Sequence, residues 1–514
     1  MLKGVITVGG WTMASRILGF ARDMLIASRL GAGPVADAFF VALKLPNLFR
    51  RLFGEGAFNA AFVPAFAGTL AVQGPKVAQQ LAERMAALMT LWLSLLVVIG
   101  IIIMPQLMQV LAPGFSDDPA KFALAIELTR ITFPYLLLIC LTALVSGVLN
   151  GMGRFAAAAA APIFFNLLSM AALLVLTPYV ATPAHALAWG VLASGAVQLG
   201  LVLWACARAG MALKILRPPA LTPEVRQVLR RMGPGIIGAG VTQLNLAVDV
   251  IIASFLPAGA VSYLYYADRV GQLPLGVIGA AIGTAMLPLL SRQVRSGERL
   301  SAHRTMNRAA EMSLLLCLPA AVGQAMLAWP IIAVLFQRGA FGAAEAGATS
   351  AALAAYAIGL PAYVLVKIFA PGFFARGDTA TPVKIGIAAV ALNLLLNLIL
   401  TQWLSHVGVA LATALAAWFN ALALGGMLWR RGQFMPDRRL RRRVPRLLAA
   451  AAVMGLALWG LQQVLLPSAP GLGFVVLLGL VVAGCGIYFA AGHLLRALDL
   501  REVRGLLRRR RKPA

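Results

Sequence analysis

The sequence predicts an all-α polytopic membrane protein with about 14 transmembrane helices, grouped into two pseudo-symmetric six-helix lobes plus two C-terminal helices. Hydrophobic residues make up 61% of the 514 residues and charged residues only 12%, about half the charged fraction of a soluble globular protein. Apolar segments of roughly 20 residues or more recur along the chain, long enough for helices that cross a hydrocarbon core of about 30 Å. An internal repeat divides these segments into two comparable sets.

The apolar segments follow one another in order, separated by short polar connections. The second one is expected to be broken around Pro46 to Gly56, because proline removes a helical hydrogen bond. The expected helices run near residues 5–30, 35–66, 84–112, 123–150, 157–178, 185–207, 233–256, 262–290, 308–337, 349–375, 383–404, 408–429, 444–466 and 471–496.

Basic residues gather in alternate connections, as the positive-inside rule describes. With a cytoplasmic N-terminus, the connections after even-numbered helices are the basic ones, whereas the opposite connections hold little beyond Lys121 and Arg338. Both termini are therefore expected in the cytoplasm. The net charge of +27 has this origin, so we expect no nucleic-acid partner.

Residues 209–232 form the longest polar stretch, and its second half is typical of a basic amphipathic helix on the cytoplasmic surface. This linker separates an N-terminal six-helix lobe (1–208) from a C-terminal one (233–430). Residues 431–514 add two helices and a basic cytoplasmic tail. The run RRRRK in that tail is expected to meet anionic lipid headgroups.

The repeat has an offset near 226 residues, which aligns RDMLIASRLGAGPVADAFF (22–40) with VDVIIASFLPAGAVSYLYY (248–266) and Asp23 with Asp249. Asn166 and Asn393 also correspond. Helix 1 pairs with helix 7 and both start on the same side, so the repeat is parallel. Transport sites in such folds form near the midplane between the lobes.

Charged residues within the first two expected helices indicate the kind of substrate. A charge at bilayer depth costs at least a few kcal/mol, so such residues usually face a water-filled cavity. Six cations stand against three acids here, and this excess predicts a large anionic substrate. The alternative is ion pairing that only fixes two helices together. The set comprises Arg16, Arg22, Arg29, Lys44, Arg50 and Arg51 with Asp23, Asp37 and Glu55.

In the second lobe, Asp268 and Arg269 lie in LYYADRVGQLP near the start of the eighth expected helix. A guanidinium donates two parallel hydrogen bonds to a phosphate. We therefore hypothesise that Arg22, Arg50 and Arg269 clamp a diphosphate.

A second candidate site centres on Asp249, deep in the seventh expected helix. Asn393, Asn397 and Thr413 on the eleventh and twelfth helices offer neutral oxygens. One carboxylate with such groups suits a sodium ion or a titrating proton. The alternative is an ordinary interhelical hydrogen-bond cluster.

Motifs for enzymatic chemistry are absent from the sequence. It contains no GxxxxGK[ST], HExxH or GxSxG, whose residues bind phosphate, bind zinc or supply a nucleophile. The four cysteines show no metal-ligand spacing. We therefore expect a transporter without a bound cofactor, apart from the sodium candidate.

Four segments carry a resemblance to a known family. They are SRILGFARD (15–23), ADAFFVALKLPNLFRRLFGEGAF (36–58), YYADR (265–269) and FAPGFFARGDTATPVKI (369–385). Over essentially its whole length the chain resembles the MurJ (MviN) family of bacterial lipid II flippases, within the multidrug/oligosaccharidyl-lipid/polysaccharide exporter superfamily.

The resemblance implies a protein of the bacterial inner membrane for peptidoglycan biosynthesis. It would flip undecaprenyl-diphosphate-linked precursor, lipid II, to the periplasmic leaflet by alternating access, driven by membrane potential, ion coupling or both. Helices 13 and 14 would form a groove for the lipid tail. A monomer in contact with membrane lipids, associated with cell-wall synthesis proteins, is the expected assembly.

The resemblance also implies residue roles. Substrate binding falls to Ser15, Arg16, Arg22, Arg50 and Arg269, and gating to Asp37 and Glu55. We add Asp23, Asp268, Lys44 and Arg51 as gating or structural charges. The sodium candidate comprises Asp249, Asn393, Asn397, Val409 and Thr413, where Asn397 is neutral at a position that can be acidic in the family.

Three other functions remain as alternatives. A cation-coupled exporter of the same superfamily would favour an acidic cavity. A membrane glycosyltransferase acting on lipid II would depend on a catalytic carboxylate. A scaffold for cell-wall synthesis would tolerate the loss of Arg22 or Arg269.

Overall fold

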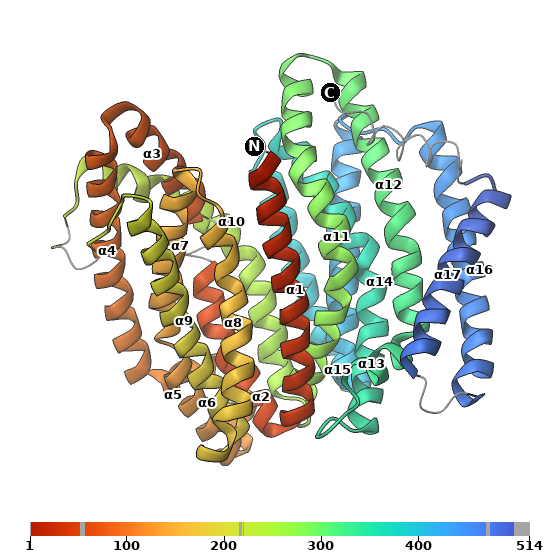
Figure 1. Ribbon diagram of the computed structural model, residues 1–514. Coiled ribbons are helices and arrows are strands. Elements are labelled where there is room, and N and C mark those ends of the chain that lie inside the picture. Colours follow the sequence, from red (N-terminus) through yellow and green to blue (C-terminus); the bar gives the residue numbers. More distant parts are fainter. Residues whose placement is uncertain (1, 52–56, 215–217, 219, 469–472, 498–514) are drawn as a thin grey trace. The chain divides into compact units, whose positions relative to one another are not determined.

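The computed structural model describes residues 2–51, 57–214, 218, 220–468 and 473–497. Within these ranges the regular structure is helical and contains no strand (Figure 1). The predicted all-α fold class is therefore confirmed. Glu55 and the RRRRK run lie outside the described residues.

The chain forms two compact units, and the first comprises Met1–Ser262 with Arg338–Gly342. Within it α1 packs against α8, α2 against α6, and α9 against both α7 and α8. Its helices are α1 (Leu2–Leu30), α2 (Pro34–Phe49), α3 (Ala57–Gln73), α4 (Pro75–Ile102), α5 (Met104–Leu111), η2 (Pro113–Asp117), α6 (Pro119–Thr132), α7 (Tyr135–Gly151), α8 (Ala156–Val175), η3 (Thr177–Tyr179), α9 (Pro183–Arg208) and α10 (Pro223–Ser254).

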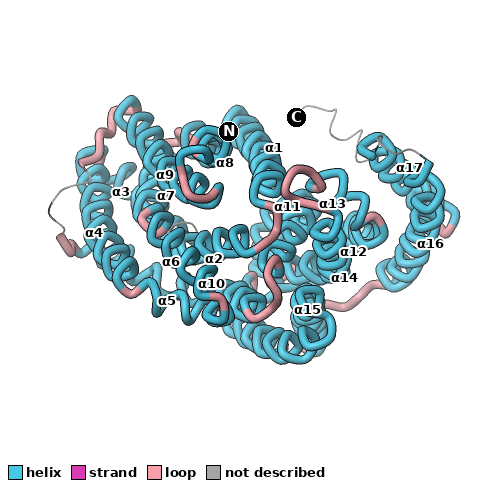
Figure 2. Tube along the Cα trace, turned by 90° about the horizontal axis from the view of Figure 1, so that it is seen from below, coloured by secondary structure: helices cyan, strands magenta, loops and turns pink. Residues whose placement is uncertain are grey.

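The second unit comprises Tyr263–Gln337 and Ala343–Ala514. Within it α12 packs against α14 and α16, and α16 and α17 lie side by side (Figure 2). Its helices are α11 (Ala260–Arg295, which begins in the first unit), α12 (Arg299–Met326), α13 (Ala328–Phe336), α14 (Ala343–Phe374), α15 (Ala380–Arg430), α16 (Arg438–Ser468) and α17 (Gly473–Leu494).

Nine helices among the described residues are long and apolar enough to cross a membrane, judged by length and composition. The charged helices α1 and α11 are not among them, and α6 with α7 counts as one span, Pro119–Gly151. The number of 14 crossings therefore stays a prediction.

The helix α15 joins two segments that the sequence predicts as separate helices, 383–404 and 408–429. Ser405 between them has φ 49° and ψ −131°, a conformation that strains a residue with a side chain. Next to it, a Cβ on Gly408 would lie 2.6 Å from the carbonyl oxygen of Leu400. Only glycine therefore fits at this sharp bend.

The basic stretch at residues 223–232 differs from the expected surface helix. It forms the first turns of α10, which continues without interruption to Ser254. Its apolar residues Val225, Val228 and Met232 are buried in the core of the first unit. The apolar face of this amphipathic segment is thus covered by protein, because α3 and α4 supply a hydrophobic surface for it.

The basic start of α16 is fastened to α12 through a buried carboxylate. Glu311 is 3% exposed and pairs with Arg308, Arg439 and Arg443. Arg308 also bonds Asp437 with an N–O distance of 2.8 Å. Part of the basic run 430–446 is therefore neutralised within the protein.

Candidate functional site

Arg22 is the best-defined member of the predicted cationic cluster. Its Nη1 donates to Oδ1 of Asn166 at 3.1 Å, and its Nε and Nη2 donate to Oδ1 of Asp23 at 3.1 and 2.7 Å. Its guanidinium carbon also lies 5.1 Å from the centre of the Phe165 ring. The side chain is 11% exposed, so a strong cation is held in a fixed orientation close to the surface of the first unit.

Asn166 connects this cation to the backbone of α1. Its Nδ2 donates to the carbonyl oxygen of Ser15 at 2.9 Å. A Cβ on Gly19 would lie 3.5 Å from the Asn166 side chain, at ordinary van der Waals distance, so the Asn166 amide packs directly against α1 at this position. Ser15 thus contributes its backbone carbonyl to the arrangement. Arg16, one residue later, is exposed.

The remaining predicted charges of the first two helices have different surroundings. Arg50 is half-buried and its Nε donates to Oδ1 of Asn47 at 3.2 Å. Lys44 is half-buried, whereas Arg29 and Arg51 are exposed. These four basic side chains of α1 and α2 are therefore accessible to solvent to different degrees, and none of them is fully buried.

Asp37, the predicted gating residue at the start of α2, is fully buried. One oxygen accepts from Nζ of Lys121 at 2.9 Å and from the backbone N–H of Gly259 at 2.7 Å. The other accepts from the N–H and the hydroxyl of Ser262 at 2.9 and 2.6 Å. The carboxylate therefore binds the N-terminus of α11, where amide donors and the helix dipole favour an anion.

Two further contacts fasten the connections of the first unit. The N–H of Gly114 donates to the hydroxyl of Ser254 at 3.1 Å, where α10 ends. The N–H of Ala340 donates to the carbonyl of Ser28 at 2.8 Å. Gly31, with φ +66°, leaves no room for a Cβ, because the Ala340 carbonyl would lie 2.5 Å away. The end of α1 and the segment at residues 338–342 therefore pack directly against each other.

In the second unit Arg269 is held by an aromatic neighbour. Its Nη2 donates to the Tyr265 hydroxyl at 3.1 Å, and its guanidinium carbon lies 4.8 Å from the ring centre. Asp268 accepts from Nε2 of Gln272 at 2.5 Å. Both residues are half-buried on α11.

The sodium candidate is divided between the units. Asn393 and Asn397 are fully buried on α15, and Nδ2 of Asn397 donates to Oδ1 of Asn393 at 3.2 Å. The Thr413 hydroxyl donates to the carbonyl of Val409 at 3.0 Å. Asp249 is half-buried on α10 of the first unit. The arrangement brings the two asparagines together; the ion site itself stays a prediction.

Lys121 and Ser262 complete the Asp37 site, and sequence reasoning missed both. Lys121 carried a signal, because it is one of the few basic residues in connections that otherwise lack them. Asn166 was noted only for its repeat partner, Asn393. Its bond to Arg22 spans 144 residues, and no local pattern indicates such a contact.

Comparison with known proteins identifies a family that the chain resembles over most of its length. The family described as lipid II flippase MurJ matches residues 26–479. A protein named probable lipid II flippase MurJ from Rhizobium tropici is 42% identical, covering 99% of this chain and 97% of its own length. A protein of the same name from Rhizobium meliloti is 43% identical, covering 99% and 96%.

A solved structure described as lipid II flippase MurJ in an inward closed conformation shares the fold. It superposes with a TM-score of 0.77 at 24% sequence identity and covers 95% of this chain and 98% of its own. At this identity the likeness supports the helical architecture alone.

Proposed function

The chain belongs to the MurJ family of lipid II flippases, and we propose that it moves lipid II from the cytoplasmic to the periplasmic leaflet of a bacterial inner membrane. The family is one of multi-pass membrane transporters, so the chain is a transporter and not an enzyme. The proposed reaction changes the position of the substrate and makes or breaks no covalent bond.

The observation that carries this proposal is the orientation of Arg22 by Asp23 and Asn166. A guanidinium that is already fixed loses little side-chain entropy when it binds a phosphate. Arg16, Arg50 and Arg269 supply further positive charge for the diphosphate. Neutralising the headgroup lowers the free-energy cost of carrying it past the hydrocarbon core.

We assign Asp37 to the gate. Its four donors come from Lys121 on α6 and from Gly259 and Ser262 at the start of α11, all within the first unit. A step of alternating access that moves the start of α11 away from α2 would break and remake this hydrogen-bonded contact. Glu55 is proposed as a second gating charge.

The driving force is proposed to be membrane potential, ion coupling or both. One elementary charge crossing the membrane gains about 2.3 kcal/mol per 100 mV. A sodium ion would bind Asp249 with oxygens of Asn393, Asn397, Val409 and Thr413. We also propose cytoplasmic termini, a lipid-tail groove at α16 and α17, and a monomer beside cell-wall synthesis proteins.

The test is translocation of labelled lipid II in liposomes, with and without an imposed potential. Arg22→Ala, Arg50→Ala and Arg269→Ala are each expected to slow transfer by about tenfold or more. Arg130→Ala, which removes an exposed arginine of α6, is the matched control. Lipid II binding without any transfer would overturn the flippase in favour of a scaffold. Unchanged transfer in the arginine variants would overturn the site.

A further inference from the structure

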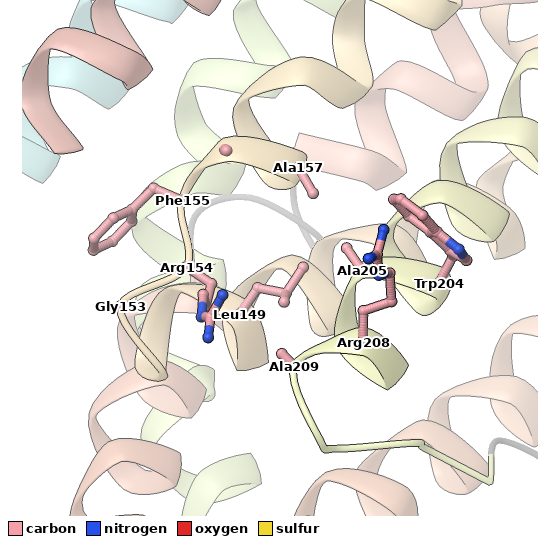
Figure 3. Close-up of a pocket in the computed structure, with 10 residues that line it drawn as sticks. Leu149, Gly153, Arg154, Phe155, Ala157, Trp204, Ala205, Arg208 and Ala209 are labelled. Atoms are coloured by element: carbon pink, nitrogen blue, oxygen red, sulfur yellow. The ribbon is translucent and has the colours of Figure 1, made fainter. Parts of the chain in front are cut away.

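A depression of about 540 Å³ lies in the first unit where α7 ends, α8 begins and α9 ends (Figure 3). Arg154 in the α7–α8 connection and Arg208 at the end of α9 both line it, and both are exposed. The Arg208 guanidinium carbon lies 5.0 Å from the centre of the Trp204 ring. The described residues that line the depression include no aspartate or glutamate, so its walls carry only positive charge.

The α14–α15 connection of the second unit has the same backbone conformation as the α7–α8 connection beside the depression. We call each of these two helix–helix connections a corner. Gly153 in the α7–α8 connection has φ +75°, and Gly377 in the α14–α15 connection has φ +78°. The next amide of each connection, on Arg154 or Asp378, donates to the carbonyl five residues earlier, at 2.8 and 3.1 Å. Arg154 therefore occupies the position that Asp378 has in the other corner.

The two corners differ in how their charges are balanced. Asp378 accepts from Nη1 of Arg431 at 2.6 Å, where Arg431 is the C-cap of α15. The corresponding end of α9 carries Arg208 as its last residue, one position before the C-cap Ala209, and Arg154 lines the same depression. One corner thus has an acid–base pair, whereas the other presents two cations to the same depression. Two like charges raise each other's energy, so this corner is complementary to an anion.

The surroundings indicate which anion is available. Connections rich in basic residues face the cytoplasm by the positive-inside rule, and tryptophan favours the membrane–water interface. Trp204 is 58% exposed, and Val197, two turns earlier on the same face of α9, is 40% exposed. The depression therefore has a cationic headgroup region above an apolar strip that an acyl chain can cover.

We propose that this depression binds an anionic glycerophospholipid of the cytoplasmic leaflet. Arg154 and Arg208 bind the phosphodiester, because guanidinium groups pair bidentately with phosphate oxygens. Trp204 and Val197 contact an acyl chain. A zwitterionic lipid binds less well, since the two arginines repel its ammonium group. This site is separate from Arg22, which we assign to the transported substrate.

The experiment uses Trp204 as the reporter. The full chain is reconstituted in phosphatidylcholine vesicles that contain either brominated phosphatidylglycerol or brominated phosphatidylcholine, and bromine quenches nearby indoles. The signal of Trp204 is the difference between the wild type and Trp204→Phe. We expect quenching to favour phosphatidylglycerol by about fivefold for each arginine.

Arg154→Asp is the decisive variant, because it reverses the charge of one wall of the depression and places an acid where the other corner has Asp378. It should abolish the preference for phosphatidylglycerol while the midpoint of thermal unfolding is kept. Arg208→Gln should weaken the preference, and Arg130→Gln, which changes an exposed arginine outside the depression, should leave it intact. Equal quenching by both lipids in the wild type would overturn the proposal. A preference that survives in both Arg154→Asp and Arg208→Gln would also overturn it.

Discussion

Asp37 and Glu311 are buried carboxylates in a strongly basic protein, one in each unit, with exposures of 0% and 3%. Asp37 accepts from one lysine, two backbone amides and a hydroxyl. Glu311 is surrounded by three arginines. The hydrogen bonds of Asp37 form only when the start of α11 lies beside α2. The interactions of Glu311 are mainly electrostatic. A contact of the first kind suits a gate, and one of the second kind suits a permanent attachment.

The largest effect is expected for Asp37→Asn. The substitution leaves the buried Lys121 ammonium without its carboxylate, and breaking such a pair costs about 3–5 kcal/mol. The free energy of unfolding in detergent measures this loss. In Asp37→Asn with Lys121→Met the loss should be smaller than the sum of the two single effects. Strict additivity would contradict the assigned pairing.

Glu311→Gln should lower the free energy of unfolding by less, about 1–3 kcal/mol. Arg308 and Arg439 are 41% and 38% exposed, so solvent and salt screen part of the interaction. We therefore expect that rising salt concentration reduces the loss of unfolding free energy caused by Glu311→Gln. The loss caused by Asp37→Asn should hardly change. The same salt response at both sites would remove the distinction drawn between them.

Asn166→Leu tests the contact between Asn166 and Arg22, whose guanidinium is partly exposed. The variant removes an acceptor of Arg22 and should lower the free energy of unfolding by about 1 kcal/mol. Translocation of lipid II should fall by roughly tenfold, because Arg22 is no longer held in place. Asn166→Asp keeps the acceptor for Arg22 but loses the donor to the Ser15 carbonyl, so it should restore transfer in part. If both variants lose stability and transfer alike, the role of Asn166 is structural only.

The smallest effect is expected from pH at Asp378, which lies outside the membrane-spanning helices. Hydrogen bonds from the backbone and side chain of Thr381, and then from Arg431, lower its pKa to about 2. The carboxylate therefore stabilises the folded state fully above its unfolded pKa of about 3.9, and this contribution is lost as pH falls toward 2. Between pH 6 and 3 the unfolding midpoint of wild type should approach that of Asp378→Asn. A difference that does not shrink would contradict this assignment.

The helical class was predictable because composition and the length of apolar segments are local properties of the sequence. The α10 segment was harder: its amphipathic pattern is the same whether lipid or protein covers the apolar face, and only the packing of Val225 and Val228 distinguishes them. The partners of Asp37 were also hidden, since Lys121 and Ser262 lie 84 and 225 residues away in the chain. Contacts at such separations follow from the packing of whole helices.

The segment Arg338–Gly342 has a consequence for the order of synthesis. It belongs to the first unit although it follows the opening helices of the second, and Ala340 supplies the donor for the Ser28 carbonyl. The ribosome must therefore have added residue 340 before the first unit acquires all its contacts. Domains usually mature from the N-terminus during translation, but here the N-terminal half waits for a late segment. The last contacts of the first unit therefore form only after the opening helices of the second have been synthesised.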